Sequence, residues 1–171
     1  MKLISTLSLL LSAAVASPFV ARQDNATNTF YLKTYGAENQ DHNDLYVYGY
    51  HTGAGLNDAV LTSDRETASA AYLNGTSVLF DYSTSFRWGM LPLGVTNYAA
   101  WQSVQINAGA GAEGFFVNGT GLQYSAQNGF GGWLVCDWYH NAPQLFYIYR
   151  YYTAKYPASC SEVKLQTEST A

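Results

Sequence analysis

Residues 131–152 read GGWLVCDWYHNAPQLFYIYRYY. The Asn-Ala-Pro sequence at 141–143 divides this stretch, because proline interrupts a strand's hydrogen-bond ladder and asparagine favours turns. The residues on both sides are largely aromatic or aliphatic, with the β-branched Val and Ile among them, a composition typical of strands. The stretch therefore predicts two strands joined by a turn, with Cys136, Asp137 and His140 placed just before that turn.

The start of the chain has the layout of a secretory signal peptide. A positively charged beginning precedes the apolar run LISTLSLLLSAAVA, whose last three residues, at 14–16, form a small-x-small cleavage site. The run is shorter than the roughly 20 residues that a membrane-spanning helix needs. We therefore expect a signal peptide over 1–16, a flexible leader over 17–28 and a single secreted all-β domain over 29–168.

Export also predicts two covalent modifications. The chain has two cysteines, Cys136 and Cys160, and an oxidising compartment makes a disulfide the default for such a pair. In the chain-entropy model this bond stabilises the fold by roughly 3 kcal/mol. Three Asn-x-Thr sequons, at Asn25, Asn74 and Asn118, predict N-glycosylation at positions that face solvent.

Alternation with a period of two residues predicts strands along most of the exported chain. The predicted strands cover 29–35, 44–51, 101–107, 133–138, 145–153 and 162–167. Residues 70–82 and 114–125 each predict a hairpin with an Asn-Gly turn. One helix signal occurs, at Ser63-x-x-Glu66, which resembles a capping box and could begin a turn or two of helix.

The two hairpins resemble each other and suggest a repeat. YLNGTSVLFDYS and FVNGTGLQYS share an aromatic-aliphatic-Asn-Gly-Thr pattern, and Asn74 and Asn118 lie about 44 positions apart. Three such periods nearly fill the exported chain, which favours a compact antiparallel domain of the β-trefoil kind. A two-sheet β-sandwich explains the same hairpins and stays as the alternative, since no third copy is visible.

Charge and motifs exclude several classes of function. The formal net charge is −4, and the few basic residues are scattered, so we expect neither nucleic acid nor a membrane as a partner. The sequence has no Gly-x-Ser-x-Gly elbow, and GAGAEG at 109–114 is a glycine cluster without the features of a phosphate loop. A glycosidase needs two carboxylates on opposite sides of the bond that it cleaves. The sequence has twelve acidic residues, and no motif identifies two of them as such a pair. We therefore expect a non-catalytic monomer without a cofactor.

The sequence argues against a catalytic cysteine and against a metal site. A cysteine nucleophile at Cys136 with His140 as its base needs a free thiol, which the expected disulfide removes. The histidines His42, His51 and His140 lack the close spacing of a zinc motif, so no metal site is expected. His51 is expected in a glycine-containing loop.

Aromatic side chains are the strongest functional signal, because exposed rings stack on the apolar faces of sugars. Alternation places the tyrosines of 44–51 on one strand face, and within 145–153 it places Tyr147, Tyr149 and Tyr151 on one face and Tyr152 on the other. The candidate binding residues are Tyr46, Tyr48, Tyr50, Tyr147, Tyr149, Tyr151 and Trp138, with Trp88, Trp101 and Trp133 as further platforms. Packing within the sheet explains the same tyrosines without any ligand.

Four segments also carry a resemblance that covers nearly the whole exported chain. NDLYVYGYHTGAGLNDAVLT, AYLNGTSVLF, NYAAWQSVQINAG and GGWLVCDWYHNAPQLFY with the later YPASC resemble a family of small secreted proteins of filamentous fungi, of uncharacterised function. More distantly, the chain is similar to fungal cell-wall-associated proteins. The resemblance implies a secreted extracellular or cell-wall protein and supplies no catalytic residues. We therefore expect a partner among cell-wall polysaccharides or extracellular proteins, with an effector-like interaction module and a small secreted hydrolase as alternatives.

Overall fold

The computed structural model describes residues 28–92, 100–125, 129–149, 153 and 155–171. These residues form strands and one short 3-10 helix. In chain order the elements are β1 (Phe30–Tyr35), η1 (Gln40–His42), β2 (Tyr46–Gly53), β3 (Leu56–Thr62), β4 (Ala71–Asn74), β5 (Ser77–Phe80), β6 (Trp88–Pro92), β7 (Trp101–Ala108), β8 (Phe115–Asn118), β9 (Gly121–Tyr124), β10 (Phe130–Asp137), β11 (Pro143–Tyr149) and β12 (Cys160–Ser169).

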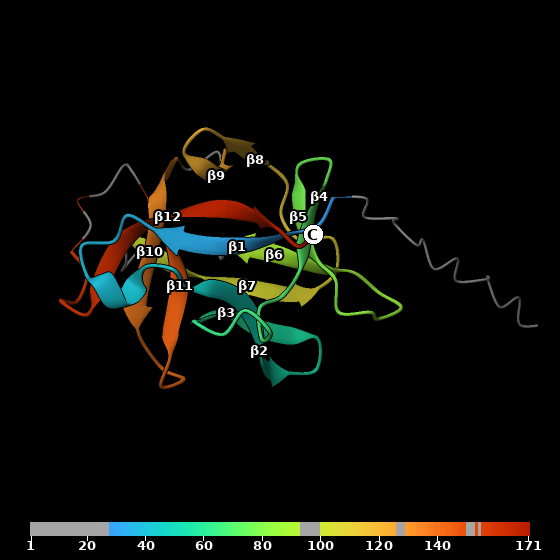
Figure 1. Cartoon of the computed structure of the whole chain (residues 1–171), viewed down its shortest axis with the longest axis horizontal. Helices are drawn as coiled ribbons and strands as arrows, with labels where there is room; N and C mark the ends of the chain where they lie inside the picture. Colours follow the sequence, from blue (N-terminus) through green and yellow to red (C-terminus); the bar gives the residue numbers. More distant parts are fainter. Residues whose placement is uncertain (1–27, 93–99, 126–128, 150–152, 154) are drawn as a thin grey trace, which may run out of the picture.

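Ten of the strands form one antiparallel sheet that closes on itself as a barrel (Figure 1). The pairing order is β10-β12-β1-β2-β3-β11-β7-β6-β5-β4, and β10 also pairs with β11 while β4 also pairs with β1. Each of these strands consequently has a neighbour on both sides. Closure removes the exposed strand edges at which sheets of different molecules aggregate.

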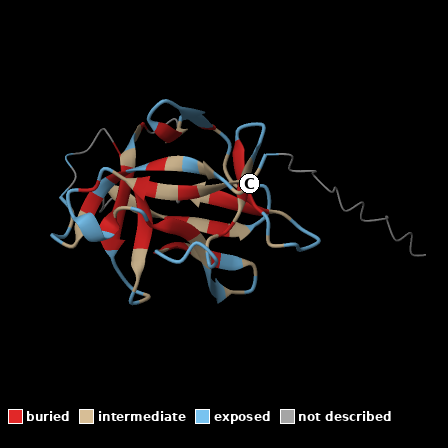
Figure 2. Ribbon diagram, viewed as in Figure 1, coloured by how far each residue is buried: buried red, intermediate tan, exposed pale blue. Residues whose placement is uncertain are grey.

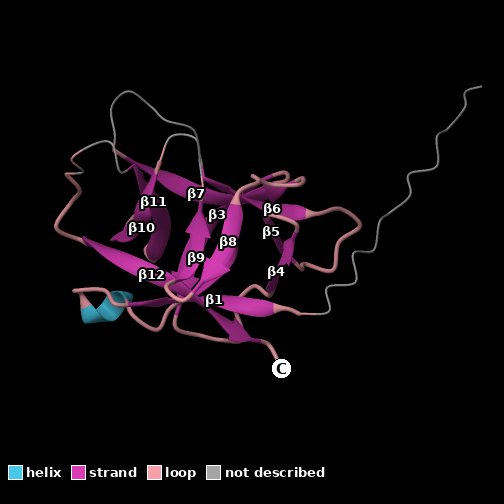
Figure 3. Ribbon diagram, turned by 90° about the horizontal axis from the view of Figure 1, so that it is seen from above, coloured by secondary structure: helices cyan, strands magenta, loops and turns pink. Residues whose placement is uncertain are grey.

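The remaining two strands, β8 and β9, form a separate hairpin that covers one end of the barrel (Figures 1 and 3). The buried side chains of Phe115 and Leu122 attach the hairpin to the barrel core. The indole nitrogen of Trp133 donates a hydrogen bond to the carbonyl oxygen of Leu122, at 2.7 Å. The hairpin thus closes the apolar interior at that end.

The core fills the barrel, and buried residues occur along most of its strands (Figure 2). On β11, Leu145, Tyr147 and Tyr149 belong to this core, whereas Phe146 and Ile148 point to the other face. The outward pair packs with Leu134 and Cys136 of β10 and with Trp101 in a second, smaller cluster. Alternation along β11 therefore buries both faces of the strand.

The structure confirms an all-β domain, and each predicted strand segment overlaps an observed strand. Prediction missed β3, whose sequence LNDAVLT begins with turn-forming residues, and β6, whose sequence WGMLP contains glycine and proline. Both are strands because neighbouring strands supply their hydrogen-bond partners. Ser63 and Glu66 lie in a loop, not a helix, where Asp64 accepts hydrogen bonds from Glu66 N and the Thr67 hydroxyl.

Neither the trefoil nor the sandwich is supported by the observed pairing. The two Asn-Gly hairpins have the same form, but β4–β5 belongs to the large sheet while β8–β9 stands apart from it. Similar local sequence therefore does not give them equivalent positions. The expected disulfide is present between Cys136 and Cys160, which are paired neighbours on β10 and β12.

The predicted signal peptide and nearly all of the predicted leader lie outside the described residues. Among the residues that the structure does describe, no helix has the length and apolar character to cross a membrane.

Candidate functional site

A surface pocket of about 410 Å³ lies on the outer face of the barrel. It occurs where β3, β7 and β11 meet: Asp58 pairs with Gln105, Gln144 pairs with Val60, and Phe146 pairs with Ser103. β3 thus changes its neighbour from β11 to β7 at this point. The pocket is lined by Asp58, Trp101, Gln102, Ser103, Trp138, Tyr139, Gln144 and Phe146.

Three aromatic rings form a corner of this pocket. Trp101 and Trp138 have ring centroids 5.5 Å apart at 87°, and Trp101 and Phe146 lie 5.0 Å apart at 81°. Trp138 and Phe146 complete the set at 5.6 Å and 79°. Edge-to-face packing of this kind fixes the rings relative to one another. Trp138 nevertheless keeps 46% of its surface exposed, so a ligand can reach it.

Hydrogen-bonding groups lie beside the aromatic corner. The Asp58 carboxylate is mostly buried and takes contacts on both oxygens: His140 Nε2 lies 2.7 Å from Oδ2, and Gln105 Nε2 lies 3.4 Å from Oδ1. Gln144 is 3% exposed, and its Oε1 has no hydrogen-bond partner among the described residues. Apolar platforms beside a few polar groups are the usual composition of a small-molecule site.

The β10–β11 turn that carries Trp138 is held at its far end by His140. The imidazole contacts Asp58 and stacks on Tyr50, with ring centroids 4.1 Å apart and planes 26° apart. Tyr50 and Asp58 are paired neighbours on β2 and β3, so both contacts come from one patch of the sheet. His140 therefore fixes the turn against the barrel wall.

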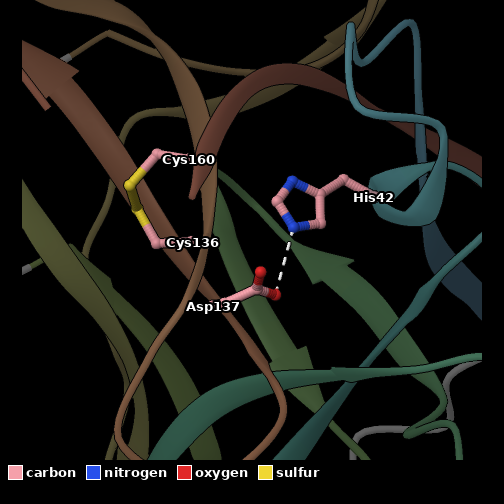
Figure 4. The surroundings of a disulfide bond; sticks show 4 residues. All are labelled: His42, Cys136, Asp137 and Cys160. Carbon is pink, nitrogen blue, oxygen red and sulfur yellow. Dashed lines mark hydrogen bonds and ion pairs between the residues drawn. A yellow bond between two sulfur atoms is a disulfide. The ribbon is translucent and has the colours of Figure 1, made fainter. Parts of the chain in front are cut away.

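The near end of the same turn is held by His42 and by the disulfide (Figure 4). The carboxylate of Asp137 points toward the buried ring of His42, whose Nε2 lies 3.3 Å from Oδ1. Asp137 also follows Cys136 directly, and its backbone N–H donates to Ser159 O at 3.2 Å. Two histidine–aspartate pairs and one disulfide thus position the segment that contains Trp138 and Tyr139.

Among the predicted binding residues, Trp138 lines the pocket and Tyr50 lies next to it, stacked on His140. Tyr48 is partly buried on the same strand, and burial raises the pKa of its phenol. Tyr46 is 7% exposed because Lys33 covers its ring and Glu168 accepts its hydroxyl hydrogen bond. The three tyrosines do share a face, but they do not form one exposed stripe.

A surface-binding role for Tyr147 and Tyr149 does not fit the structure. They are 3% and 1% exposed, belong to the barrel core and have their hydroxyl groups in contact with each other. Burial is the main cause that raises the pKa of the Tyr147 phenol well above its ordinary value. Tyr151 lies outside the described residues. The platforms Trp88 and Trp133 are also buried.

Sequence reasoning missed Asp58 and Gln144 and ranked Trp101 only as an accessory platform. Alternation along LNDAVLT would have placed Asp58 on the face opposite Ala59 and Leu61, had that segment been taken as a strand. Nothing local marks Gln144. Its significance comes from being nearly fully buried beside a pocket, which only the assembled sheet shows.

The predicted glycosylation sites Asn74 and Asn118 are exposed and border the turns of the two Asn-Gly hairpins. Asn25 lies outside the described residues. His51, expected in a loop, instead lies in β2 and is exposed near the β2–β3 turn, with Nδ1 3.3 Å from Asn57 Oδ1. In the part of the chain that the structure describes, no three His, Cys, Asp or Glu side chains gather as metal ligands would.

Comparison with known proteins identifies a family but no activity. No curated protein and no solved structure matches the chain. A family model does match residues 27–169, which is most of the sequence. The expectation of an uncharacterised family is thereby confirmed, and the chain belongs to the family described as Domain of unknown function (DUF7907).

Proposed function

We propose that this protein is a secreted, non-catalytic protein of the extracellular space or cell wall that binds carbohydrate in the pocket at the β3–β7–β11 junction. The observation that carries the proposal is the exposed Trp138 in its aromatic corner, directly beside the polar groups of Asp58 and Gln144. Sugar rings present apolar faces to aromatic rings and hydroxyl groups to side chains at their edges.

The compartment argument supports the same proposal. The signal-peptide pattern at 1–16, the sequons and the disulfide between Cys136 and Cys160 fit an exported protein. The resemblance to secreted proteins of filamentous fungi adds cell-wall polysaccharide as the nearest source of ligand. The pocket is preformed, because the turn that carries Trp138 is fixed by His42, His140 and the disulfide. Preformed sites bind weak ligands at a smaller entropic cost.

The test is a binding assay of the purified protein against a panel of cell-wall polysaccharides and their oligomers, with tryptophan fluorescence and calorimetry as readouts. The Trp138→Ala variant should bind at least about tenfold more weakly, a loss of about 1.4 kcal/mol of binding free energy. Phe116→Ala is the matched control, because Phe116 is 45% exposed but lies on β8, outside the pocket. Equal affinity of the two variants, or no binding by the native protein, would contradict the proposal.

One observation favours a hydrolase as the second candidate function. Asp58 and His140 form a close, mostly buried pair at the pocket, and Ser103 also lines it. A carboxylate that orients a histidine is one part of several hydrolytic sites. Incubation with chromogenic ester and glycoside substrates tests this candidate: turnover that is lost in His140→Gln would favour it over binding alone.

A further inference from the structure

The pocket that we propose as the carbohydrate site has charged side chains of one sign only in its lining. Of its lining residues, Asp58 carries a negative charge, and none is lysine or arginine. His140 adjoins the pocket but is engaged with Asp58. Two hydrogen-bond acceptors belong to lining residues of this pocket: the carboxylate of Asp58 and the carbonyl oxygen of the Gln144 side chain.

Both acceptors have unused capacity. A carboxylate has about four lone-pair positions, and among the described residues the Asp58 carboxylate has two polar contacts, with His140 and Gln105. Gln144 Oε1 is buried and has no hydrogen-bond partner among the described residues, which is unfavourable for a polar atom unless solvent or a ligand supplies a donor. These two acceptors therefore favour a ligand that supplies hydrogen-bond donors.

The aromatic rings of the pocket also favour a positively charged ligand. Trp101, Trp138 and Phe146 meet at nearly right angles, and Trp138 keeps 46% of its surface exposed, so part of an aromatic ring is open to a ligand. The face of an aromatic ring attracts a cation, and tryptophan does so most strongly. An ammonium group satisfies both requirements, because it is positively charged and carries only donors.

We propose that the pocket selects glycans with free, protonated amino groups, as in oligomers of glucosamine, over neutral, N-acetylated and acidic glycans. This specificity rests on the carbohydrate binding proposed above. The ammonium group occupies the corner formed by the aromatic rings and donates to Asp58 and Gln144, while the sugar face covers Trp138. N-acetylation removes the positive charge and two of the donors, and the carboxylates of acidic glycans are repelled by Asp58.

The experiment compares three oligosaccharides of equal length and linkage by calorimetry: glucosamine, N-acetylglucosamine and glucose oligomers. All are measured at one pH at which the free amine is protonated. The glucosamine oligomer should bind at least about tenfold more tightly than the other two, and added salt should weaken its binding alone. Binding of all three with equal affinity would overturn the selectivity and leave carbohydrate binding intact. Binding of none would overturn both proposals.

A matched pair of variants excludes simple attraction between a cationic oligomer and a chain of net charge −4. Asp58→Asn and Glu66→Gln each remove one negative charge, but Glu66 is exposed in the turn after β3 and does not line the pocket. Asp58→Asn should abolish the preference for the free amine, and Glu66→Gln should retain it. Equal losses in the two variants would show that net charge causes the preference and would overturn the proposal. Circular dichroism of Asp58→Asn checks that the barrel remains folded.

Discussion

His140 Nε2 lies 2.7 Å from Asp58 Oδ2, although 82 positions separate the two residues in the sequence. The contact joins the β10–β11 turn to β3, and Trp138 of that turn lines the pocket together with Asp58. The pocket therefore depends on a contact between two elements whose sequences give no sign of it.

Replacing His140 by alanine should destabilise the protein and weaken ligand binding. The variant leaves the mostly buried Asp58 carboxylate with one polar contact fewer and removes the stacked ring from Tyr50. Loss of one partner of a buried polar group costs about 1–3 kcal/mol, which urea unfolding monitored by circular dichroism will measure. Phe116→Ala, on β8 and 45% exposed, should change the unfolding free energy by no more than about 0.5 kcal/mol. A similar loss in both variants would show that the His140 contact is not the cause.

Removing the disulfide should cost about 2–5 kcal/mol of unfolding free energy. The bond joins β10 to β12 immediately before the pocket turn. A Cys136→Ala/Cys160→Ala double variant is preferable to a single replacement, because it leaves no free thiol. Urea unfolding should give the reduced protein and the double variant the same unfolding free energy, below that of the oxidised protein. Mass analysis that finds two free thiols in the native protein would refute the bond.

Gly121→Ala should displace the β8–β9 hairpin from the barrel. A Cβ atom at Gly121 would lie 2.1 Å from the carbonyl oxygen of Leu165, and the residue has φ of +101°. Neither the backbone of β12 nor this conformation adapts to a side chain, so we expect a loss of at least about 1–3 kcal/mol. Gly119→Ala, two residues earlier with nothing within 4 Å, is the control and should stay within about 0.5 kcal/mol of the native protein. Equal effects would contradict the close approach.

Acid should weaken the fold partly through Glu168. A hydrogen bond from Arg65 is the main cause that lowers the pKa of this carboxyl, with smaller contributions from Tyr46 and Lys33. A lowered folded-state pKa gives stability that is complete above the ordinary value of 4.5 and is lost as the pH falls through the lowered pKa. Glu168→Gln should therefore reduce the slope of stability against pH below about 4.5, as measured by thermal unfolding. Glu66→Gln, outside the Arg65–Glu168 pair, should leave the slope unchanged.

Glycosylation should occur at the two hairpin turns when the chain is expressed through a eukaryotic secretory pathway. Asn74 and Asn118 are exposed and border tight turns, and an attached oligosaccharide needs such a solvent-facing position. Enzymatic deglycosylation should lower the mass, and Asn74→Gln and Asn118→Gln should each remove part of that difference. An unchanged mass would show that the two sequons are unoccupied.

Local chemistry was sufficient to predict most of the strands and both Asn-Gly hairpins. Alternation and turn residues act over a few positions, so segments such as 70–82 and 114–125 are readable without their partners. β3 and β6 were not readable, because glycine, proline and turn-forming residues lie within or at the start of them. Their strand conformation comes from hydrogen bonds to β2 and β7, whose positions depend on the whole barrel.

The sequence by itself determined the all-β class and the pairing of Cys136 with Cys160, since a chain with two cysteines has one possible internal disulfide. It also sorted the aromatic residues of β11 into two alternating sets. Only the tertiary structure decided which set faces the core, because burial depends on which strands lie on either side. Closure of the barrel placed Tyr147 and Tyr149 inside and brought Trp138, Trp101 and Phe146 to one outer pocket. A residue's role as core or as ligand contact is set by these long-range pairings.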